Sequence, residues 1–244
     1  MVRADALVLH RRASDWRRNG QVDSTAYAQV MAGLSGDLSA SAARQQLESN
    51  GYVIIGVGDW ATVFARPGDL SCVRLVPVDP AYRLFAEDLL TGPSHTSFPH
   101  VHELLPLKGD AFAVVLERLW PADEAAAQLF CDRLSDDPAL WSRIAGLEAK
   151  GAERYPHLWG GLDIRPGNVL SDATGELKLI DPVFLAGEKV VDALRAVDRV
   201  SLSDLTRSEV EAFPDIACFH RVHDRYEGVE ELKQLIAHLF WPTA

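Results

Sequence analysis

Residues 161–181 read GLDIRPGNVLSDATGELKLID, and they hold the chain's most specific arrangement of polar residues. Asn168 follows Asp163 by five positions, and Asp181 comes after a predicted hairpin whose polar turn is residues 172–175. Because carboxylate and amide oxygens are ligands that Mg²⁺ prefers, we expect Asn168 and Asp181 to hold that ion. Asp163 would take or orient a proton on an attacking hydroxyl. The alternative interpretation is a polar turn with Asx hydrogen bonds.

The same loop carries a cation, because Arg165 lies two positions after Asp163. A guanidinium at that point would put a fixed positive charge beside a phosphoryl group during its transfer. The loop therefore indicates phosphoryl transfer, with Asp163 and Arg165 as candidate catalytic residues and Asn168 and Asp181 as candidate metal ligands.

A glycine-rich segment lies upstream, where residues 56–63 read GVGDWATV. Gly56 and Gly58 would let the backbone approach a phosphate closely and offer its amide donors. A strand is predicted to follow, whereas a helix follows the glycines of a Rossmann turn or a Walker loop. The segment is therefore typical of a hairpin that covers a nucleotide, with a simple hairpin turn as the alternative. Trp60 is interpreted as a packing residue, with cover for the nucleotide as its alternative role.

Hydrophobic patterning and turn residues predict an α+β chain. Strands are expected over 52–55, 60–65, 70–76, 101–105 and 111–117, with a helix over 80–90 after the third. Next are expected helices over 122–134 and 138–154, a hairpin of 168–171 and 176–180, and three or four helices from about residue 189. Ahead of the strands, two helices are expected, from Asp23-Ser24 to about Ser35 and from Ser39 or Ser41 to Asn50.

The glycine-rich hairpin and the later polar loop resemble the motifs of the protein kinase-like superfamily. That group includes eukaryotic-type Ser/Thr kinases, RIO kinases and aminoglycoside phosphotransferases, and the resemblance covers about residues 52–200. The family's glycine-loop pattern matches Gly56, Gly58 and Val63, while Ala61 stands where the third glycine would be. The resemblance implies that ATP is the phosphoryl donor and that Mg²⁺ accompanies it.

The second motif also matches with one departure. The catalytic-loop pattern of the family matches Asp163 and Asn168, although Gly161 stands where the family has His. The metal-binding Asp of the D-F-G motif matches Asp181, which is followed here by Pro182.

Further ATP-binding positions follow from the resemblance. The third-strand Lys of the family falls on Arg74, whose partner on the inserted helix would be Glu87, with Asp88 as the second choice. The backbone groups of Glu117 and Leu119 would hydrogen-bond adenine. Arginine keeps the positive charge of lysine, but it is longer and planar. We expect Arg74 to position phosphates, and the alternative is an Arg74–Glu87 ion pair that only stabilises the fold.

The resemblance also implies an architecture. We expect a bilobal protein kinase-like fold with an N-terminal helical extension at residues 1–50. An antiparallel β-rich N-lobe would follow at residues 51–118, and a helical C-lobe at residues 119–244.

The charge balance is acidic, with 24 Lys and Arg against 35 Asp and Glu and a net charge of −11. This balance argues against general nucleic-acid binding and against binding to an anionic membrane surface. The 3 cysteines are scattered, and they give neither a disulfide framework nor a zinc site. No apolar run approaches the roughly 18 residues of a membrane helix. We expect a cytoplasmic protein, and its oligomeric state is left open.

Three functions remain open at this point. The first is an ATP- and Mg²⁺-dependent kinase acting on Ser or Thr of a protein, because Arg165 matches the protein-kinase position. Only 44 positions separate Leu119 from Asp163, which leaves little room for an acceptor-binding insertion. The second is an aminoglycoside-type small-molecule phosphotransferase, favoured by residues 166–168 (PGN) and the short C-terminal region. The third is a pseudokinase-like regulatory or antitoxin binding module, favoured by Arg74, Gly161 and the missing third glycine.

Overall fold

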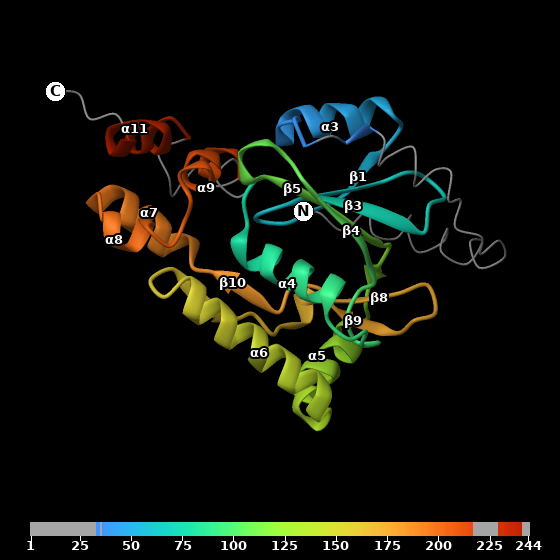
Figure 1. The fold of residues 1–244 in the computed structure, drawn as a ribbon. Helices are drawn as coiled ribbons and strands as arrows, with labels where there is room; N and C mark the ends of the chain where they lie inside the picture. Colours follow the sequence, from blue (N-terminus) through green and yellow to red (C-terminus); the bar gives the residue numbers. More distant parts are fainter. Residues whose placement is uncertain (1–32, 35, 217–228, 241–244) are drawn as a thin grey trace.

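The computed structural model describes residues 33–34, 36–216 and 229–240, and an antiparallel sheet of five strands dominates it (Figure 1). The strands are β1 (Val53–Val57), β2 (Thr62–Ala65), β3 (Ser71–Val76), β4 (Val101–Pro106) and β5 (Phe112–Glu117). Their order across the sheet is β1-β2-β3-β5-β4, and each neighbouring pair is antiparallel. The predicted α+β class and the five antiparallel strands are confirmed.

The central strand β3 is apolar on both faces. Val73 and Leu75 pack into the core on one side of the sheet, while Cys72 and Val76 pack into the core on the other side. Successive side chains of a strand point to opposite faces, so a strand covered on both sides has little room for polar residues. Arg74 is the exception, and its position in the strand places it on the same face as Cys72 and Val76.

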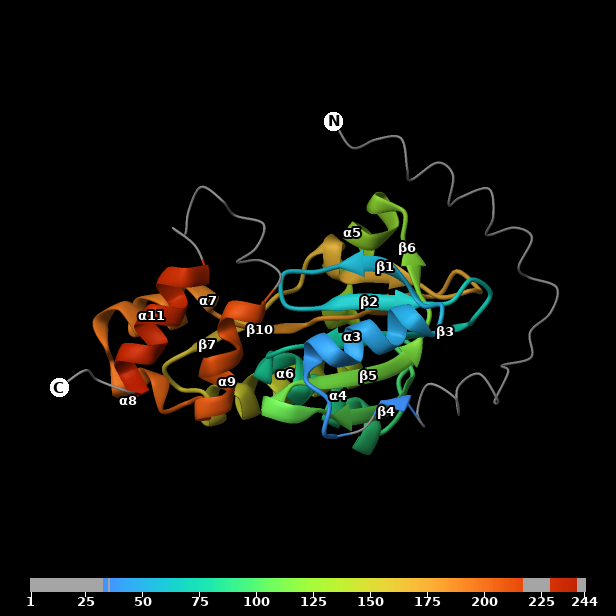
Figure 2. The same cartoon turned by 90° about the horizontal axis from the view of Figure 1, so that it is seen from above.

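Two helices cover the two faces of this sheet, as Figures 1 and 2 show. Helix α3 (Ala40–Ser49) begins at Ser39, whose hydroxyl accepts a hydrogen bond from the Ala42 amide, and it buries Ala43 and Leu47 against the sheet. Helix α4 (Pro80–Thr91) follows β3 and packs on the opposite face. Both helices confirm predictions. The other predicted N-terminal helix, over residues 24–35, lies almost wholly outside the described residues.

The second half of the chain contains a smaller β layer between helices. It comprises β6 (Trp120–Pro121), β7 (Trp159–Leu162), β8 (Val169–Ser171), β9 (Leu177–Leu179) and β10 (Val183–Leu185). The order of one sheet is β6-β8-β9, which confirms the predicted β8–β9 hairpin, and the other pairs β10 with β7. Neither β6, β7 nor β10 was predicted, because all three are short and β7 (WGGL) contains two glycines, which are unfavourable in strands.

Helices make up most of the remainder. The described ones are α5 (Glu124–Asp132), α6 (Pro138–Arg154), α7 (Gly187–Ala196), α8 (Arg199–Leu202), α9 (Arg207–Ala212) and α11 (Val229–Phe240). Short 3₁₀ turns occur at η2 (Lys108–Asp110), η3 (Leu134–Asp136), η4 (Pro166–Asn168) and η5 (Phe213–Asp215). These confirm the expected helical second half. Among the described residues, no helix is both long and apolar enough to cross a membrane.

The two β layers share one hydrophobic core. It contains side chains of the five-stranded sheet and α4 together with side chains of α6, β8, β9 and the last helices. Because this core continues across residue 118, and a second core packs Ala43 and Leu47 of α3 against the sheet, the fold does not by itself mark the boundaries expected at residues 50 and 118, which stay predictions.

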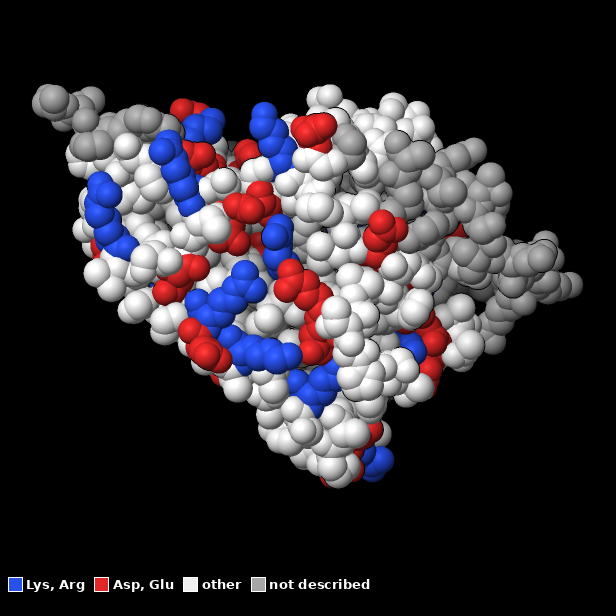
Figure 3. Space-filling model, viewed as in Figure 1, with Lys and Arg blue, Asp and Glu red and all other residues white. Residues whose placement is uncertain are grey.

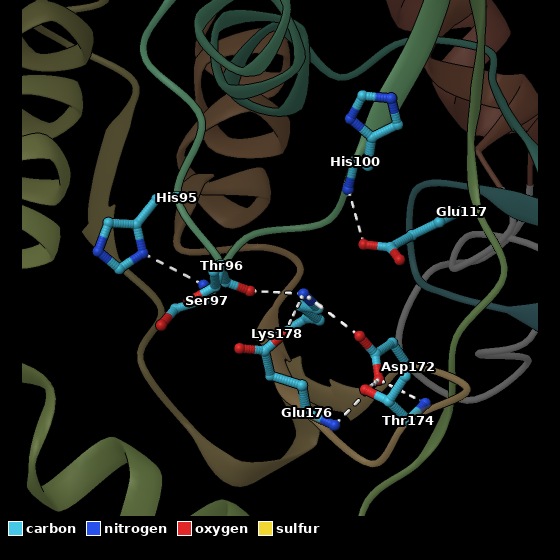
Figure 4. Close-up of polar contacts among 9 residues, drawn as sticks. All are labelled: His95, Thr96, Ser97, His100, Glu117, Asp172, Thr174, Glu176 and Lys178. Atoms are coloured by element: carbon cyan, nitrogen blue, oxygen red, sulfur yellow. Dashed lines mark hydrogen bonds and ion pairs between the residues drawn. The ribbon is translucent and has the colours of Figure 1, made fainter.

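A buried lysine joins the layers at one point (Figure 4). Lys178, in β9, is 6% exposed, and its Nζ donates to the Thr96 carbonyl oxygen at 2.6 Å and to Glu176 Oε2 at 3.1 Å. The Asp172 carboxylate lies 3.4 Å away. Directly after Lys178, the Leu179 amide donates to the Ser97 carbonyl oxygen at 2.8 Å. The loop between α4 and β4 is therefore bound to the strand that leads to Asp181.

The packing of α6 on β7 generates a stability prediction. A Cβ atom at Gly151, a buried position in α6, would overlap the ring of Trp159. Gly151→Ala should therefore lower the free energy of unfolding by about 2 kcal/mol, although alanine favours helix more than glycine does. Gly146, in the same helix, has no atom within 4 Å of an added Cβ. Gly146→Ala is the matched control, and it should raise that free energy by about 0.5–1 kcal/mol. Urea denaturation measures both, and equal effects of the two substitutions would contradict this packing.

Candidate functional site

The polar loop predicted from the sequence forms a hydrogen-bonded unit between β7 and β8. Its centre is Asn168, which is 7% exposed. The Asn168 amide nitrogen donates to the carbonyl oxygen of Asp163 at 2.8 Å, to Asp163 Oδ2 at 2.9 Å and to the Asp181 carbonyl oxygen at 2.9 Å. The Asp163 amide in turn donates to the carbonyl oxygen of Pro182 at 2.8 Å. These bonds hold Asp163, Asn168 and Asp181 together, as the sequence predicted, and the Asn168 amide oxygen is then the atom available to a cation.

Arg165 lies beside the Asp163 carboxylate. Its Nε is 3.0 Å from each carboxylate oxygen, and its side chain is 60% exposed. The expected proximity of the two residues is therefore present. Because the Arg165 side chain is largely in solvent, it can leave Asp163 and contact another anion at little cost.

Arg74 extends from β3 to the same place. Its Nη2 donates to Asp181 Oδ2 at 2.8 Å, with the two side chains 11% and 27% exposed. Burial lowers the pKa of Arg74, but the charges of Asp181 and other neighbours raise it by more, so the guanidinium stays charged. The buried Nε of Arg74 has no hydrogen-bond partner among the described residues.

Two residues around Arg74 were not predicted from the sequence. Tyr82, in α4, lies under the guanidinium, whose carbon is 3.5 Å from the ring centroid. Asp79 caps the start of α4, accepting from the Tyr82 amide at 2.9 Å, and it is buried. Its sequence signal, Asp79 before Pro80, is that of a helix start and does not point to a site. Only the fold brings this carboxylate near Arg74 and Asp181.

The two buried carboxylates affect each other's protonation. Burial and then the charge of Asp181 raise the pKa of Asp79 to about 7, and Arg74 offsets only part of this increase. Burial also raises the pKa of Asp181, although the ion pair with Arg74 opposes it. Since Arg74 donates its hydrogen bond to Asp181, Asp181 keeps the charge more readily and Asp79 takes the proton.

Glu87 does not pair with Arg74, so the ion pair expected from the resemblance is not formed. Tyr82, Phe85 and Ala86 form the face of α4 that packs into the core, and Glu87 is exposed. The next residue is not a substitute, because Asp88 Oδ2 accepts from Arg143 Nε of α6 at 2.6 Å.

Figure 3 shows basic and acidic side chains interspersed on the face that it draws.

The glycine-rich segment is a β1–β2 hairpin. Gly56 lies opposite Val63, and the Gly58 amide donates a hydrogen bond to the Ala61 carbonyl oxygen at 2.8 Å, which closes the turn. Val63 in turn lies opposite Arg74, so the two residues share one face of the sheet. The hairpin tip contacts the helical part, where Trp60 meets Phe213 edge-to-face at 5.6 Å between ring centroids. The interpretation of Trp60 as a packing residue is confirmed.

The segment after β5 presents few free backbone groups. The Glu117 amide donates to the His100 carbonyl oxygen at 2.9 Å, and the Glu117 side chain accepts from the His100 amide at 2.7 Å (Figure 4). The Cys72 thiol lies 3.6 Å from the Glu117 carbonyl oxygen, and burial raises the pKa of Cys72 to about 12, which keeps it a donor. The backbone of Leu119 has no hydrogen bond to the described residues. The two residues expected to contact adenine thus differ: the backbone groups of Glu117 have partners within the chain, and those of Leu119 have none among the described residues.

Comparisons with known proteins add little to this geometry. No protein-family model and no curated protein matches the sequence. Among solved structures, the chain is similar to one in the CAK complex from Chaetomium thermophilum bound to ATP-gamma-S, with 19% identity and a TM-score of 0.34. The match covers 57% of this chain and 48% of that chain, so it spans about half the length of its relative. At this TM-score the two chains share too little backbone to transfer any property from one to the other.

The buried Asp79 generates a pH prediction. An unfolded Asp ionises near pH 3.8, whereas folded Asp79 keeps its proton to about pH 7. Between these values the folded state binds more protons than the unfolded state, so stability falls as pH rises through this window. Asp79→Asn keeps a carbonyl oxygen for the Tyr82 amide and cannot ionise. At pH 8 it should be more stable than the wild type by about 2 kcal/mol, and at pH 4 the difference should largely disappear. Urea denaturation at both pH values tests this, and a difference independent of pH would contradict it.

Proposed function

We propose that this chain is a phosphotransferase of protein kinase-like fold, which moves the γ-phosphoryl group of ATP to a hydroxyl acceptor with Mg²⁺. One observation supports this most directly, namely that the Asn168 amide nitrogen hydrogen-bonds to both the Asp163 and the Asp181 segments. A proton acceptor and a ligand pair thereby lie in one site, next to a charged arginine from the sheet. The resemblance supplies the expected lobes, residues 51–118 and 119–244.

The residues present fit both Mg²⁺ and the phosphates of ATP. The Asp181 carboxylate and the Asn168 amide oxygen are hard oxygen ligands of the kind that Mg²⁺ prefers. The unpaired Nε of Arg74 is a buried donor that a phosphate oxygen would satisfy. When bound, Mg²⁺ would neutralise charge on the phosphates.

The chain's own residues would then have separate roles in the transfer. Asp163 accepts the proton of the acceptor hydroxyl, because its carboxylate is held in place by Asn168 and remains 29% exposed. Arg165, whose side chain is 60% exposed, stabilises charge on the transferred group. Arg74 orients phosphates from the sheet side, and Gly56 and Gly58 let the backbone of the β1–β2 hairpin approach them closely.

For the acceptor we propose Ser or Thr of a protein. The position of Arg165 and the short stretch between Leu119 and Asp163 support this choice. An aminoglycoside-type acceptor is the alternative within the same chemistry.

A non-catalytic binding module is the second candidate function, and a specific observation favours it. Both carboxylates are paired with arginine, Asp181 with Arg74 and Asp163 with Arg165, so neither is free for its catalytic partner in this state.

The test uses purified protein, radiolabelled ATP and Mg²⁺, with a cell lysate in one arm and an aminoglycoside panel in another. Asp163→Asn keeps the shape of the side chain but removes the base. It should lower transfer by about 10²–10⁴-fold while leaving nucleotide binding unchanged. Asp136→Asn, at an exposed position, is the matched control and should leave both unchanged.

The arms separate the candidate functions. Label on a lysate protein that disappears with Asp163→Asn supports the protein kinase, whereas label on an aminoglycoside supports the small-molecule enzyme. Full transfer by the Asp163→Asn variant contradicts the assigned base. ATP binding without transfer in either arm identifies the binding module.

A further inference from the structure

Arg74 is held by an aromatic ring of α4 rather than by an acidic residue of that helix. Its guanidinium carbon lies 3.5 Å from the centroid of Tyr82, which is 1% exposed. This is close to the contact distance of stacked planar groups, and a guanidinium stacks on aromatic faces in this way. Glu87, the residue expected to hold Arg74, is exposed and does not pair with it.

The ring of Tyr82 is itself fixed on several sides. Its backbone amide is bound by the Asp79 carboxylate at 2.9 Å in the first turn of α4. The ring is nearly parallel to that of Phe112 in β5, at 6.5 Å and 12°, and meets Phe85 edge-to-face at 5.9 Å. Tyr82 is therefore a rigid surface between helix and sheet, and its position does not depend on Arg74.

Stacking determines where the arginine donors point. The N–H bonds of a guanidinium lie in its plane, so a ring that fixes the plane confines their directions to it. In that plane Nη2 donates to Asp181 Oδ2 at 2.8 Å. A lysine ammonium has no such plane and would gain charge attraction from the ring without the same orientation. The departure from lysine at position 74 and the aromatic residue at position 82 thus explain one another.

We propose that Tyr82 is a positioning residue, whose ring orients the Arg74 guanidinium toward Asp181 and takes the role expected of Glu87. This rests on the proposed function insofar as the oriented group is the one that would hold phosphate. A consequence is that Arg74→Lys, although it keeps the charge, behaves as a disruptive substitution at this site.

The first measurement is independent of nucleotide chemistry. In ¹⁵N-arginine-labelled protein, the Arg74 Nε–Hε signal, assigned by its loss in Arg74→Lys, should lie upfield through the ring current of Tyr82. It should also exchange slowly with water, because Nε is buried. A wild-type signal among those of exposed arginines overturns the proposal without any variant at position 82.

Variants then test the ring itself. Tyr82→Phe keeps the ring and should leave the Arg74 signal upfield, whereas Tyr82→Leu removes it and should return the signal to the ordinary range. Phe98→Leu is the matched control, since Phe98 is a buried ring that contacts a different arginine, Arg143, at 5.1 Å. It should leave the Arg74 signal in place. An unchanged Arg74 signal in folded Tyr82→Leu overturns the proposal.

A second measurement relates the contact to ligand binding. With a fluorescent ATP analogue, Tyr82→Leu and Arg74→Lys should each weaken binding by about tenfold, and Tyr82→Phe should stay within about twofold of wild type. Wild-type affinity in Arg74→Lys contradicts the requirement for a planar group. If wild type binds no nucleotide but the arginine signals behave as described, the proposed function fails while the positioning role of Tyr82 stands.

Discussion

The ion pair between Arg74 and Asp181 is the contact on which the site depends, because it joins the central strand of the sheet to the loop after β9. The two residues are 107 positions apart in the chain. Arg74 is the only polar residue in β3 beyond the first, and the sheet is buried on both faces there. A charge in that place needs compensation, and Asp181 with the ring of Tyr82 provides it.

Three buried polar side chains fix the positions of the segments next to this ion pair. Asn168 binds the Asp163 and Asp181 segments to each other, and Lys178 binds β9 to the loop before β4. Asp79 starts α4 at the point where Tyr82 must face the sheet. Each of these side chains has at least one backbone partner, so the geometry of the site depends on the fold and not on exposed side chains alone.

The prediction succeeded where local patterning decides structure. β3 and β5 were found from their apolar runs, α6 from its helix-period apolar positions, and the glycine hairpin from its paired glycines. It failed for β7, whose sequence WGGL contains two glycines, and for β10, whose three residues VFL are too few to form a recognisable pattern; the two strands pair with each other in the fold. It also failed for Glu87, because its exposed position on α4 depends on which face of that helix packs inward.

The α+β class follows from hydrophobic patterning along the chain, and the grouping of Asp163, Asn168 and Asp181 follows from their spacing within a short segment. The surroundings of Arg74, in contrast, depend on tertiary packing. Its neighbours Asp79, Tyr82 and Asp181 come from a helix cap, a helix face and a distant loop. Long-range electrostatic and stacking partners depend on how helices and strands pack against one another. That packing depends on burial throughout the core, which no local sequence pattern encodes.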